Sequence, residues 1–383
     1  MLCVHDRVQI VHFSLFSIKY WKLFYRNSYF CGVLHNLFHI QGKSMNTISM
    51  QRIVRITLFI LLNSAFYHVA PVYANDIFKS LTVNDGLAHT DANCIAQDST
   101  GLIWIGTNSG LQNFDGYQLQ TIDYYPSGQK VYESHNRINA VECSKNRLWI
   151  GSDSGLTCLD LSTHLYIPYS IVANDHSVLQ ERILSLSIDN TCNRLWIRTL
   201  TRLCIAQIEE STNTLHILDW ENDYDRDISW NNSKPLVCRG HVWMLSGDYL
   251  VQLGVENGRV KIIGHYNLHT ITGSHVTDLF VTDEYLYLRS WEGCYRVAFM
   301  GDSPNINDVA YVDFCKTDAV IPQNTSGVFI VDRDGTLWCT YFGGIFKVVR
   351  PFTGNAVVHV YLGNNKNVNF SQSRIPSLFI DTY

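Results

Sequence analysis

Several features of disordered and fibrous chains are absent from this sequence. It has no low-complexity segment and no coiled-coil repeat, and charged residues make up only 16% of its 383 residues. Hydrophobic residues make up 46% and aromatic residues 13%, which is ample for a large packed core. These proportions argue against intrinsic disorder.

Cys-x-x-Cys pairs are also absent, although cysteine itself is not rare. Nine cysteines lie between residues 75 and 383, and an odd number cannot all form disulfides. Cys158, Cys204 and Cys294 each follow a copy of a repeated phrase, so we expect small buried thiols between stacked sheets. Cys192 and Cys315 are the two whose oxidation is worth testing.

The dominant feature that is present is one phrase that occurs six times. Residues 101–111 read GLIWIGTNSGL, and eroded copies follow at regular spacing. The aromatic residues that anchor the six copies are 45, 47, 47, 44 and 51 residues apart. These anchors are Trp104, Trp149, Trp196, Trp243, Tyr287 and Trp338. A period of about 40–50 residues with several short strands per repeat is typical of β-propellers.

The first full repeat predicts four antiparallel strands. They are expected at Asn93–Asp98, Leu102–Thr107, Leu111–Asp115 and Tyr117–Asp123. Gly, Ser, Asn and Asp separate these segments, and such residues supply the backbone angles and local hydrogen bonds of tight turns. The fold class predicted is therefore all-β, a propeller of four-stranded blades.

The anchor aromatics and two glycines have an expected structural role. A tryptophan in the second strand buries about 150–250 Å² where blades pack face to face. Gly106 and Gly151 follow the first two anchors by two residues, and glycine lets neighbouring strands approach closely near the axis. We expect all of these residues to be scaffold.

Six blades are recognisable and a seventh is begun. Further innermost strands are expected at Ile138–Cys143, Ile183–Asp189, Leu236–Cys238, Val276–Asp283 and Gly327–Asp332. Another begins at Ile375–Asp381, where the chain stops, and Asp76–Val83 is expected to be a strand that completes the last blade. An unpartnered closing strand would leave open sheet edges, so we expect a C-terminally truncated propeller.

The N-terminal region is expected to lie outside the fold. Residues 50–74 have Arg52 and Arg55, a short apolar run and a small residue at the end, which is the pattern of a cleavable secretory signal. The run Ile56–Leu62 is shorter than the 20 or so residues that span a bilayer. Residues 1–49 are expected to be a wrongly assigned extension with the true start at Met45 or Met50, and residues 75–383 to be the propeller.

Cleavage after residue 74 would leave a strongly acidic protein. The remaining residues hold 22 Lys and Arg against 33 Asp and Glu, a net charge of −11. Such a surface repels phosphate backbones, so we expect no nucleic acid to be bound by this chain.

Residues 85–116 resemble a known repeat family. The motifs are Asp85-Gly86-Leu87, QDSTG at residues 97–101, IWIGT at residues 103–107 and Phe114-Asp115-Gly116. Together they are similar to two-component-regulator propeller repeats, which form the periplasmic sensor part of hybrid histidine kinases. The likeness covers about residues 77–381, with the later repeats degenerate. A WD40 propeller is disfavoured because no Gly-His and Trp-Asp pairing recurs.

The resemblance implies a periplasmic sensor domain that detects carbohydrate fragments for signal transduction. In the family, two propellers and a small β-sandwich precede a membrane helix, and kinase, receiver and DNA-binding domains follow. None of those later parts is recognisable in the 383 residues, so we expect no enzyme activity and no cofactor. The expected partners are an oligosaccharide and a second propeller or protomer.

A ligand site is expected at the axial mouth, where the second strands end. Arginine replaces glycine two residues after the anchor in the third and fifth repeats, and guanidinium groups bind carboxylate or sulfate by forked hydrogen bonds. The candidates are Arg198, Arg289, Trp291, Asn108, Asp153, Arg202, Tyr341 and Phe342. The alternative is that the two central arginines, Arg198 and Arg289, only pair with nearby acidic residues.

Other chemistry is less well supported by the pattern. His265 and His269 would bind a metal together only on a helix, and we expect solvated loop histidines instead. Gly151–Gly155 has Asp at the centre of a GxSxG-like turn and is not a nucleophile elbow. Carboxylates in residues 220–230 leave a polysaccharide-acting enzyme open. A pure interaction scaffold with only a dimerisation face and a non-functional truncated fragment are the further alternatives.

Overall fold

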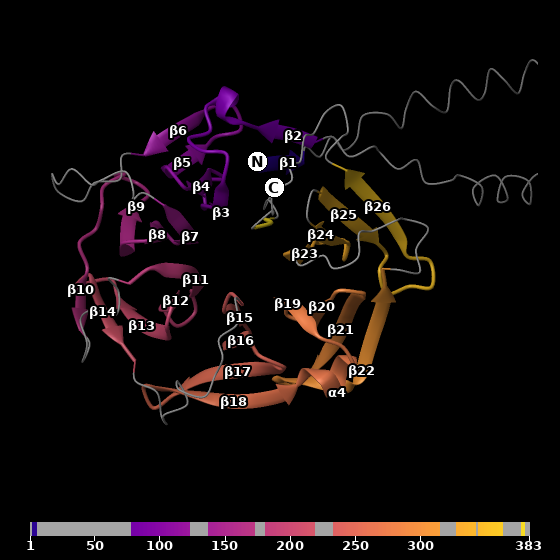
Figure 1. The fold of residues 1–383 in the computed structure, drawn as a ribbon. Helices are drawn as coiled ribbons and strands as arrows, with labels where there is room; N and C mark the ends of the chain where they lie inside the picture. The colour runs from indigo at the N-terminus through magenta and orange to yellow at the C-terminus, as the bar shows by residue number, and fades with distance from the viewer. Residues whose placement is uncertain are drawn as a thin grey trace, which may run out of the picture. The chain divides into compact units, whose positions relative to one another are not determined.

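The computed structural model describes residues 2–5, 78–122, 137–172, 181–218, 233–314, 327–341, 344–362 and 377–379. The chain divides into two units, residues 1–3 with 79–383 and residues 4–78. The larger unit is all-β apart from short helical turns, and its six sheets lie in a ring, as Figure 1 shows. The structure therefore confirms a β-propeller with six blades. Among the described residues, no helix has the length and apolar character needed to cross a membrane.

Four of the six blades have the predicted four antiparallel strands. Blade 1 consists of β3 (Ala92–Gln97), β4 (Ile103–Thr107), β5 (Gly110–Phe114) and β6 (Leu119–Ile122). Blade 4 consists of β15 (Leu236–Cys238), β16 (His241–Ser246), β17 (Tyr249–Glu256) and β18 (Arg259–Asn267). Blade 5 consists of β19 (Val276–Val281), β20 (Tyr285–Ser290), β21 (Gly293–Met300) and β22 (Ser303–Asp313). Blade 6 consists of β23 (Phe329–Val331), β24 (Leu337–Tyr341), β25 (Gly344–Val349) and β26 (Val357–Leu362).

Blades 2 and 3 depart from the prediction of four strands each. Blade 2 has β7 (Ile138–Ser144), β8 (Arg147–Ser152) and β9 (Gly155–Asp160). Blade 3 has β11 (Ile183–Asp189), β12 (Arg194–Thr199), β13 (Leu203–Glu209) and β14 (Thr214–Ile217), and β10 (Ser170–Val172) adds to its outer edge, parallel to β14.

A proline explains why the fourth strand of blade 2 is lost. Tyr166 still forms an isolated antiparallel bridge with Leu159, and Ile167 donates its N–H to the carbonyl of Cys158 at 2.9 Å. Pro168 follows at once and has no N–H to donate to a ladder. The chain therefore leaves blade 2 and pairs with blade 3.

The ends of the ring also differ from the sequence prediction. The predicted closing strand forms as β2 (Phe78–Leu81), but its partner is β1 (Leu2–His5) and not a strand of the last blade. Ser377–Phe379, the described part of the predicted seventh blade, are not in a strand. The signal segment, the acidic residues 220–230, Cys315 and Phe342 lie outside the described residues.

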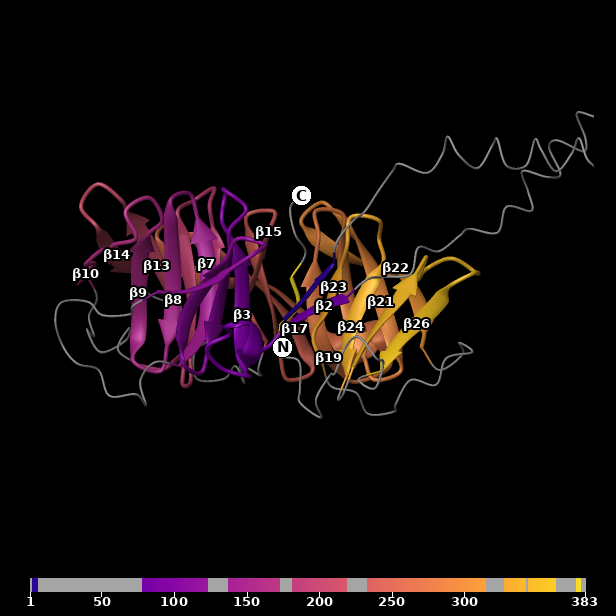
Figure 2. The ribbon, with the colours of Figure 1, turned by 90° about the horizontal axis from the view of Figure 1, so that it is seen from above.

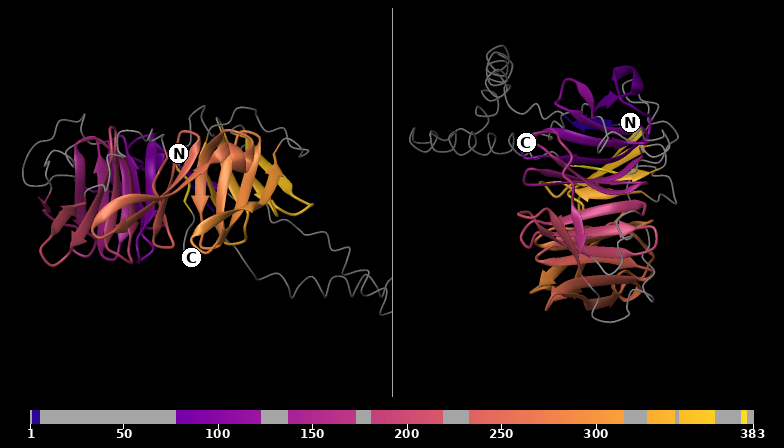
Figure 3. Two further views of the ribbon diagram at one scale, coloured as in Figure 1. Left: turned by 90° about the horizontal axis from the view of Figure 1, so that it is seen from below. Right: turned by 90° about the vertical axis from the view of Figure 1, so that its left-hand side faces the viewer.

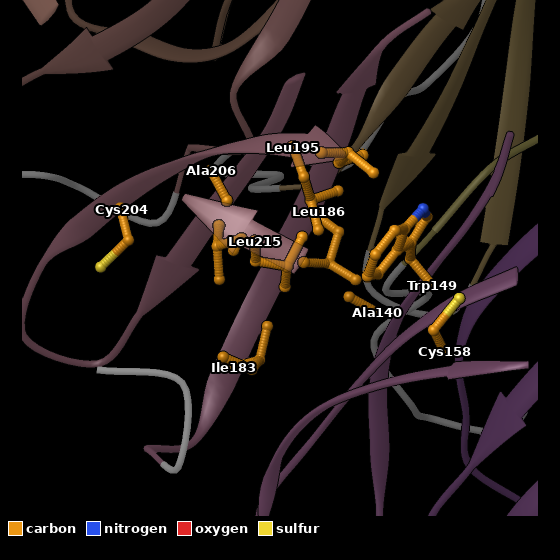
Figure 4. Close-up of a cluster of buried hydrophobic side chains, with 11 residues drawn as sticks. Ala140, Trp149, Cys158, Ile183, Leu186, Leu195, Cys204, Ala206 and Leu215 are labelled. Carbon is orange, nitrogen blue, oxygen red and sulfur yellow. The ribbon is translucent and has the colours of Figure 1, made fainter. Parts of the chain in front are cut away.

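Packing runs from each blade to the next, which fits the predicted role of the anchors. Five hydrophobic clusters join blade 1 to 2, 2 to 3, 3 to 4, 4 to 5 and 5 to 6. Figure 4 shows the second of these, in which Trp149 of blade 2 lies beside Leu186 of blade 3. The first five anchors each belong to the cluster with the following blade and are at most 6% exposed. Trp338 is half-buried and belongs to none of the five described clusters.

The two repeat glycines lie where neighbouring blades approach each other closely. A Cβ atom added to Gly106 would lie 2.6 Å from Cγ2 of Ile138 in blade 2, and one added to Gly151 would lie 2.5 Å from Cγ2 of Ile183 in blade 3. Both distances are too short for real carbon atoms. The prediction that glycine permits close blade approach is confirmed at both positions.

The Asp85-Gly86-Leu87 motif covers the face of blade 1 that points away from blade 2. Asp85 caps the 3-10 turn η1 (Val83–Asp85) through the backbone N–H and hydroxyl of Thr82. Gly86 then has a positive φ of 101°, which favours glycine. Gln112 of β5 is buried beneath, where it accepts from the N–H of Ala88 and donates to the carbonyl of Gly86.

Cysteines in the described part of the propeller are free thiols. Cys158, Cys204 and Cys294 are buried, as predicted. Burial raises the pKa of Cys94 and of Cys158 to about 12 in each case. Cys192 is exposed, in the turn between β11 and β12.

Candidate functional site

Successive strands run antiparallel, so the loop into each innermost strand and the turn between strands two and three share one end of a blade. Ala92 at the start of β3 pairs with Thr107 at the end of β4, which demonstrates this for blade 1. We call the end formed by these loops and turns the turn face. Figures 2 and 3 show turns gathered at the two ends of the upright strands. Four predicted ligand residues, Asn108, Asp153, Arg202 and Trp291, lie in turns of this face.

On blades 1 and 2, two asparagines that the sequence analysis missed join the turn face to the next blade. Asn93 Nδ2 donates to Oδ1 of Asn108 at 2.9 Å and to the carbonyl oxygen of Ile138 in blade 2 at 2.9 Å. Asn139 repeats this arrangement, with bonds to Oδ1 of Asp153 at 2.7 Å and to the carbonyl oxygen of Ile183 in blade 3 at 3.0 Å. Each asparagine is the extra residue of a β-bulge in its innermost strand, which redirects its side chain.

These bonds give Asn108 and Asp153 a structural role at the blade junctions. Asn108 also donates from Nδ2 to Asp91 at 2.9 Å, and Asp153 forms an ion pair with Nε of Arg182 at 3.0 Å. The signal for this pattern was in the sequence, because an asparagine occupies the same position in the first two innermost strands. The prediction of the ligand site rested on the second strands alone, where this asparagine does not occur.

Arg202 is held by an acidic partner on the turn face of blade 3. Its Nη2 donates to Oε1 of Glu181 at 2.6 Å, and Thr201 Oγ1 donates to the other carboxylate oxygen at 2.9 Å. The hydrogen bond from Arg202 lowers the pKa of Glu181 below its usual value. This pairing agrees with a structural role, and a ligand role for Arg202 stays a prediction.

Arg289 lies inside the protein and not in an open mouth. Its side chain on β20 is 1% exposed. Nη1 donates to the carbonyl oxygens of Gly327 at 2.7 Å and Val328 at 3.2 Å, and Nη2 donates to that of Thr340 at 2.9 Å. All three acceptors belong to the part of the chain that builds blade 6. Burial favours a structural role for Arg289, which joins blade 5 to blade 6 through backbone carbonyl oxygens where the sequence analysis expected acidic partners.

Asp278 on the neighbouring strand β19 also links blade 5 to blade 6. It lies opposite Arg289 in the register of β19 and β20, and its Oδ2 accepts from the backbone N–H of Phe329 in blade 6 at 3.1 Å. Blades 5 and 6 are therefore linked by polar groups where blades 1 to 3 use asparagine.

Arg198 and Tyr341 are also buried. Arg198 on β12 is 7% exposed, and burial lowers its pKa. Tyr341 ends β24 and packs against Phe346 in the cluster between blades 5 and 6. Neither side chain offers a surface on the turn face, and this burial argues against direct contact with a sugar. Their role in ligand binding stays a prediction.

Among the predicted site residues that the structure describes, Trp291 is the most exposed. It lies in the turn between β20 and β21, and 49% of it is exposed. The ring of His275 meets it edge-on, with centroids 5.7 Å apart. His275 in turn lies 3.6 Å from Asp248 of blade 4, measured from Nδ1 to Oδ1. The sequence analysis missed His275 and Asp248, because their meeting depends on how two blades pack.

The structure also shows where the candidate metal-binding histidines and the GxSxG-like turn lie. His265 lies on β18, stacked on Tyr249, and His269 lies on α4 (Leu268–Thr272), which differs from the expected loop. Ser152 donates to the carbonyl of Gly155 within a strand-to-strand turn, as expected. No group of three His, Cys, Asp or Glu side chains placed to hold a metal ion occurs in the described parts of the chain.

Sequence comparison identifies the repeat that begins at the Asp85-Gly86-Leu87 motif. Residues 86–109 match the family model described as two component regulator propeller. The chain carries a two-component regulator propeller repeat. Histidine kinase P4 of Formosa agariphila is 43% identical to it over 47 residues, which are 12% of this chain and 3% of that kinase.

Comparison of the folds extends the likeness beyond this repeat. The extracellular domain of the hybrid two component system BT3049 from B. thetaiotaomicron has a TM-score of 0.53 at 17% identity, over 79% of this chain and 39% of that one. PorZ, a surface component of the type-IX secretion system of Porphyromonas gingivalis, has a TM-score of 0.50 at 13% identity, over 76% of this chain and 35% of PorZ. The propeller therefore spans well under half of either structure. At these identities the likeness shows a shared fold.

Proposed function

We propose that this two-component regulator propeller is the sensor domain of a hybrid two-component system, on the outer side of the inner membrane. The match of residues 86–109 carries the proposal. Those residues build the cover over blade 1 and strands β3 and β4, so the repeat is part of the folded propeller. The likeness in fold to an extracellular domain of a hybrid system supports the same function.

The signal in this proposal is a carbohydrate fragment, and its detection requires no reaction. Ligand binding to one of two arrangements of the sensor shifts their populations, and only a difference in affinity between the two transmits a signal. A second propeller or protomer supplies the contact that differs between the arrangements. Phosphoryl transfer belongs to other parts of such a system.

Thermal unfolding of the purified chain with a glycan panel tests the proposal. The panel holds neutral, uronic acid and sulfated oligosaccharides, each at several concentrations. A ligand at 100 times its Kd stabilises the folded state by about 2.7 kcal/mol, so at least one member is expected to raise Tm in a saturable manner. Hydrolysis products in the same samples would instead support an enzyme. A panel without any saturable shift would contradict carbohydrate detection.

A further inference from the structure

Three side chains from blades 4 and 5 meet on the turn face. Trp291, His275 and Asp248 come from three separate connections, the turn β20–β21, the loop after α4 and the turn β16–β17. The side chains of His275 and Asp248 are 52% and 75% exposed. We call these three residues the indole cluster. They combine an open aromatic ring with a neighbouring imidazole and carboxylate.

The loop that carries His275 is held in place by its own hydrogen bonds. Asn267 caps α4 through the N–H of Thr270, and Gly273 ends it in the left-handed region with its N–H on the carbonyl of His269. Leu268 donates its N–H to the carbonyl of Asp248 at 2.9 Å, which ties the loop to the turn of blade 4. The position of His275 beside Asp248 is therefore built into the backbone.

The turn that carries Trp291 is similarly constrained. Ser290 Oγ accepts from the N–H of Gly293 at 3.1 Å, and the carbonyl of Glu292 accepts from the N–H of Phe314 at 2.8 Å. Ser274 Oγ, next to His275, lies 3.2 Å from the hydroxyl of Tyr295 on β21, and this contact ties the loop after α4 to the strand that follows the turn. The indole is thus presented on a rigid turn, which lowers the entropy lost when a ligand stacks on it.

The chemistry of the indole cluster suits a neutral sugar. One face of a pyranose ring carries C–H groups that pack on an aromatic plane, and the hydroxyls at its rim need donors and acceptors. His275 and Asp248 supply these groups, since imidazole donates and accepts and carboxylate accepts. The neighbouring acidic groups, Asp248 and Glu292, repel an anionic ligand, and the guanidinium of Arg289 is buried on carbonyl oxygens.

We propose that the indole cluster binds a neutral sugar unit of an oligosaccharide, with the pyranose stacked on Trp291 and its hydroxyls on His275 and Asp248. The proposal rests on the proposed function in carbohydrate detection and names its site and ligand class. It replaces acidic sugars, which the two central arginines suggested, with uncharged ones.

Titration of the full chain with defined oligosaccharides tests this site. The probes are cellohexaose, maltohexaose, xylohexaose and laminarihexaose, with oligogalacturonate and a sulfated hexasaccharide as the acidic probes, and binding is measured by calorimetry. At least one neutral probe is expected to bind. The variant Trp291→Ala is expected to weaken binding about tenfold or more, and Trp291→Phe, which keeps an aromatic face, by about threefold or less. His275→Ala is expected to weaken it about fivefold.

Tyr117→Ala is the matched control, because Tyr117 is a surface aromatic residue of blade 1 that is 90% exposed. It is expected to leave binding unchanged, and equal Tm values for all variants would show that the fold is intact. Binding of a neutral probe that survives Trp291→Ala would overturn the site and leave carbohydrate sensing in place. Binding of an acidic probe alone would overturn the ligand class, again without affecting the sensor function. Failure of every probe to bind would overturn both proposals.

Discussion

The indole Nε1 of Trp104 donates a hydrogen bond of 2.9 Å to Oδ2 of Asp98, six residues earlier in the chain. The other carboxylate oxygen of Asp98 accepts from the backbone N–H groups of Thr100 and Leu102 and so closes the turn between β3 and β4. Trp338 and Asp332 repeat the pair in blade 6 at 2.9 Å. By contrast, the buried Nε1 atoms of Trp149, Trp196 and Trp243 have no hydrogen-bond partner among the described residues.

Removal of the Asp98 carboxylate is expected to destabilise the propeller markedly. Asp98→Ala leaves the buried indole N–H of Trp104 and two turn N–H groups unsatisfied, at a cost of about 2–4 kcal/mol in the free energy of unfolding. Urea unfolding measures the change. Asp115→Ala is the control, since Asp115 closes an exposed turn through Tyr117 and Gln118 and should cost less than about 1 kcal/mol. Equal losses in the two variants would show that the buried indole bond is unimportant.

A methyl group at Gly106 is expected to disturb the junction of blades 1 and 2. Gly106→Ala places Cβ against Ile138 and Cys94, and overpacking of this kind costs about 1–3 kcal/mol. The same change at Gly354, which has no atom within 4 Å of the added Cβ, should alter the free energy of unfolding by less than about 0.5 kcal/mol. Urea unfolding measures both changes, and the prediction is wrong if Gly106→Ala alters the free energy of unfolding as little as Gly354→Ala does.

Loss of the Arg289 guanidinium is expected to weaken the junction between blade 5 and blade 6 and so to lower the stability of the fold. Arg289→Met keeps much of the side-chain volume but leaves buried carbonyl oxygens of Gly327 and Thr340 without this donor, at a cost of at least about 3 kcal/mol. Arg202→Gln breaks a partly exposed ion pair with Glu181 and should cost less than about 1 kcal/mol. A mild effect of Arg289→Met in thermal unfolding would instead return this arginine to the list of ligand candidates.

Acid is expected to destabilise the fold through carboxylates whose pKa is lowered in the folded state. Hydrogen bonds from Ser162 and Thr163 lower the pKa of Asp160 to about 2. The folded-state pKa is below the unfolded one, so this stabilisation is complete above about pH 4 and is lost as the pH falls toward 2. Urea midpoints of wild type and Asp160→Asn, measured from pH 5 to pH 2, should converge at the acidic end. Parallel curves would contradict the assignment.

Thiol reactivity in the folded protein is expected to differ sharply between cysteines. Cys192 is exposed and should be alkylated by iodoacetamide at neutral pH. Cys94 and Cys158 are buried, and burial raises the pKa of each to about 12, so their peptides should stay unlabelled until urea is added. Mass spectrometry of the digested protein reports each cysteine separately. Early labelling of Cys94 would show that the first blade junction opens readily.

The parts of the fold that repeat could be predicted from the sequence. The innermost strands Ile183–Asp189 and Leu236–Cys238 match β11 and β15 residue for residue, because the anchors fix the phase of each repeat. The addition of β10 to blade 3 could not be predicted, because its partner strand β14 lies far along the chain, with Ser170 paired to Thr214. Pro168 was the local sign that blade 2 would lose a strand.

The candidate site was predicted less well than the fold, for a physical reason. The position of Arg289 at the end of a second strand indicated an open mouth, but its acceptors Gly327 and Thr340 lie 38 and 51 residues further along the chain. Whether an arginine is exposed or buried depends on such distant backbone atoms. The turn positions of Asn108, Asp153 and Trp291 follow directly from the repeat and were predicted correctly.

The five hydrophobic clusters, each shared by two successive blades, also determine how the domain opens. Blades 2 to 5 each share one of these clusters with both of their neighbours. The stability of the domain is then close to a sum over nearest-neighbour junctions, as in other repeat proteins. Hydrogen exchange of backbone amides should therefore reveal several opening steps, each of which exposes one junction between successive blades.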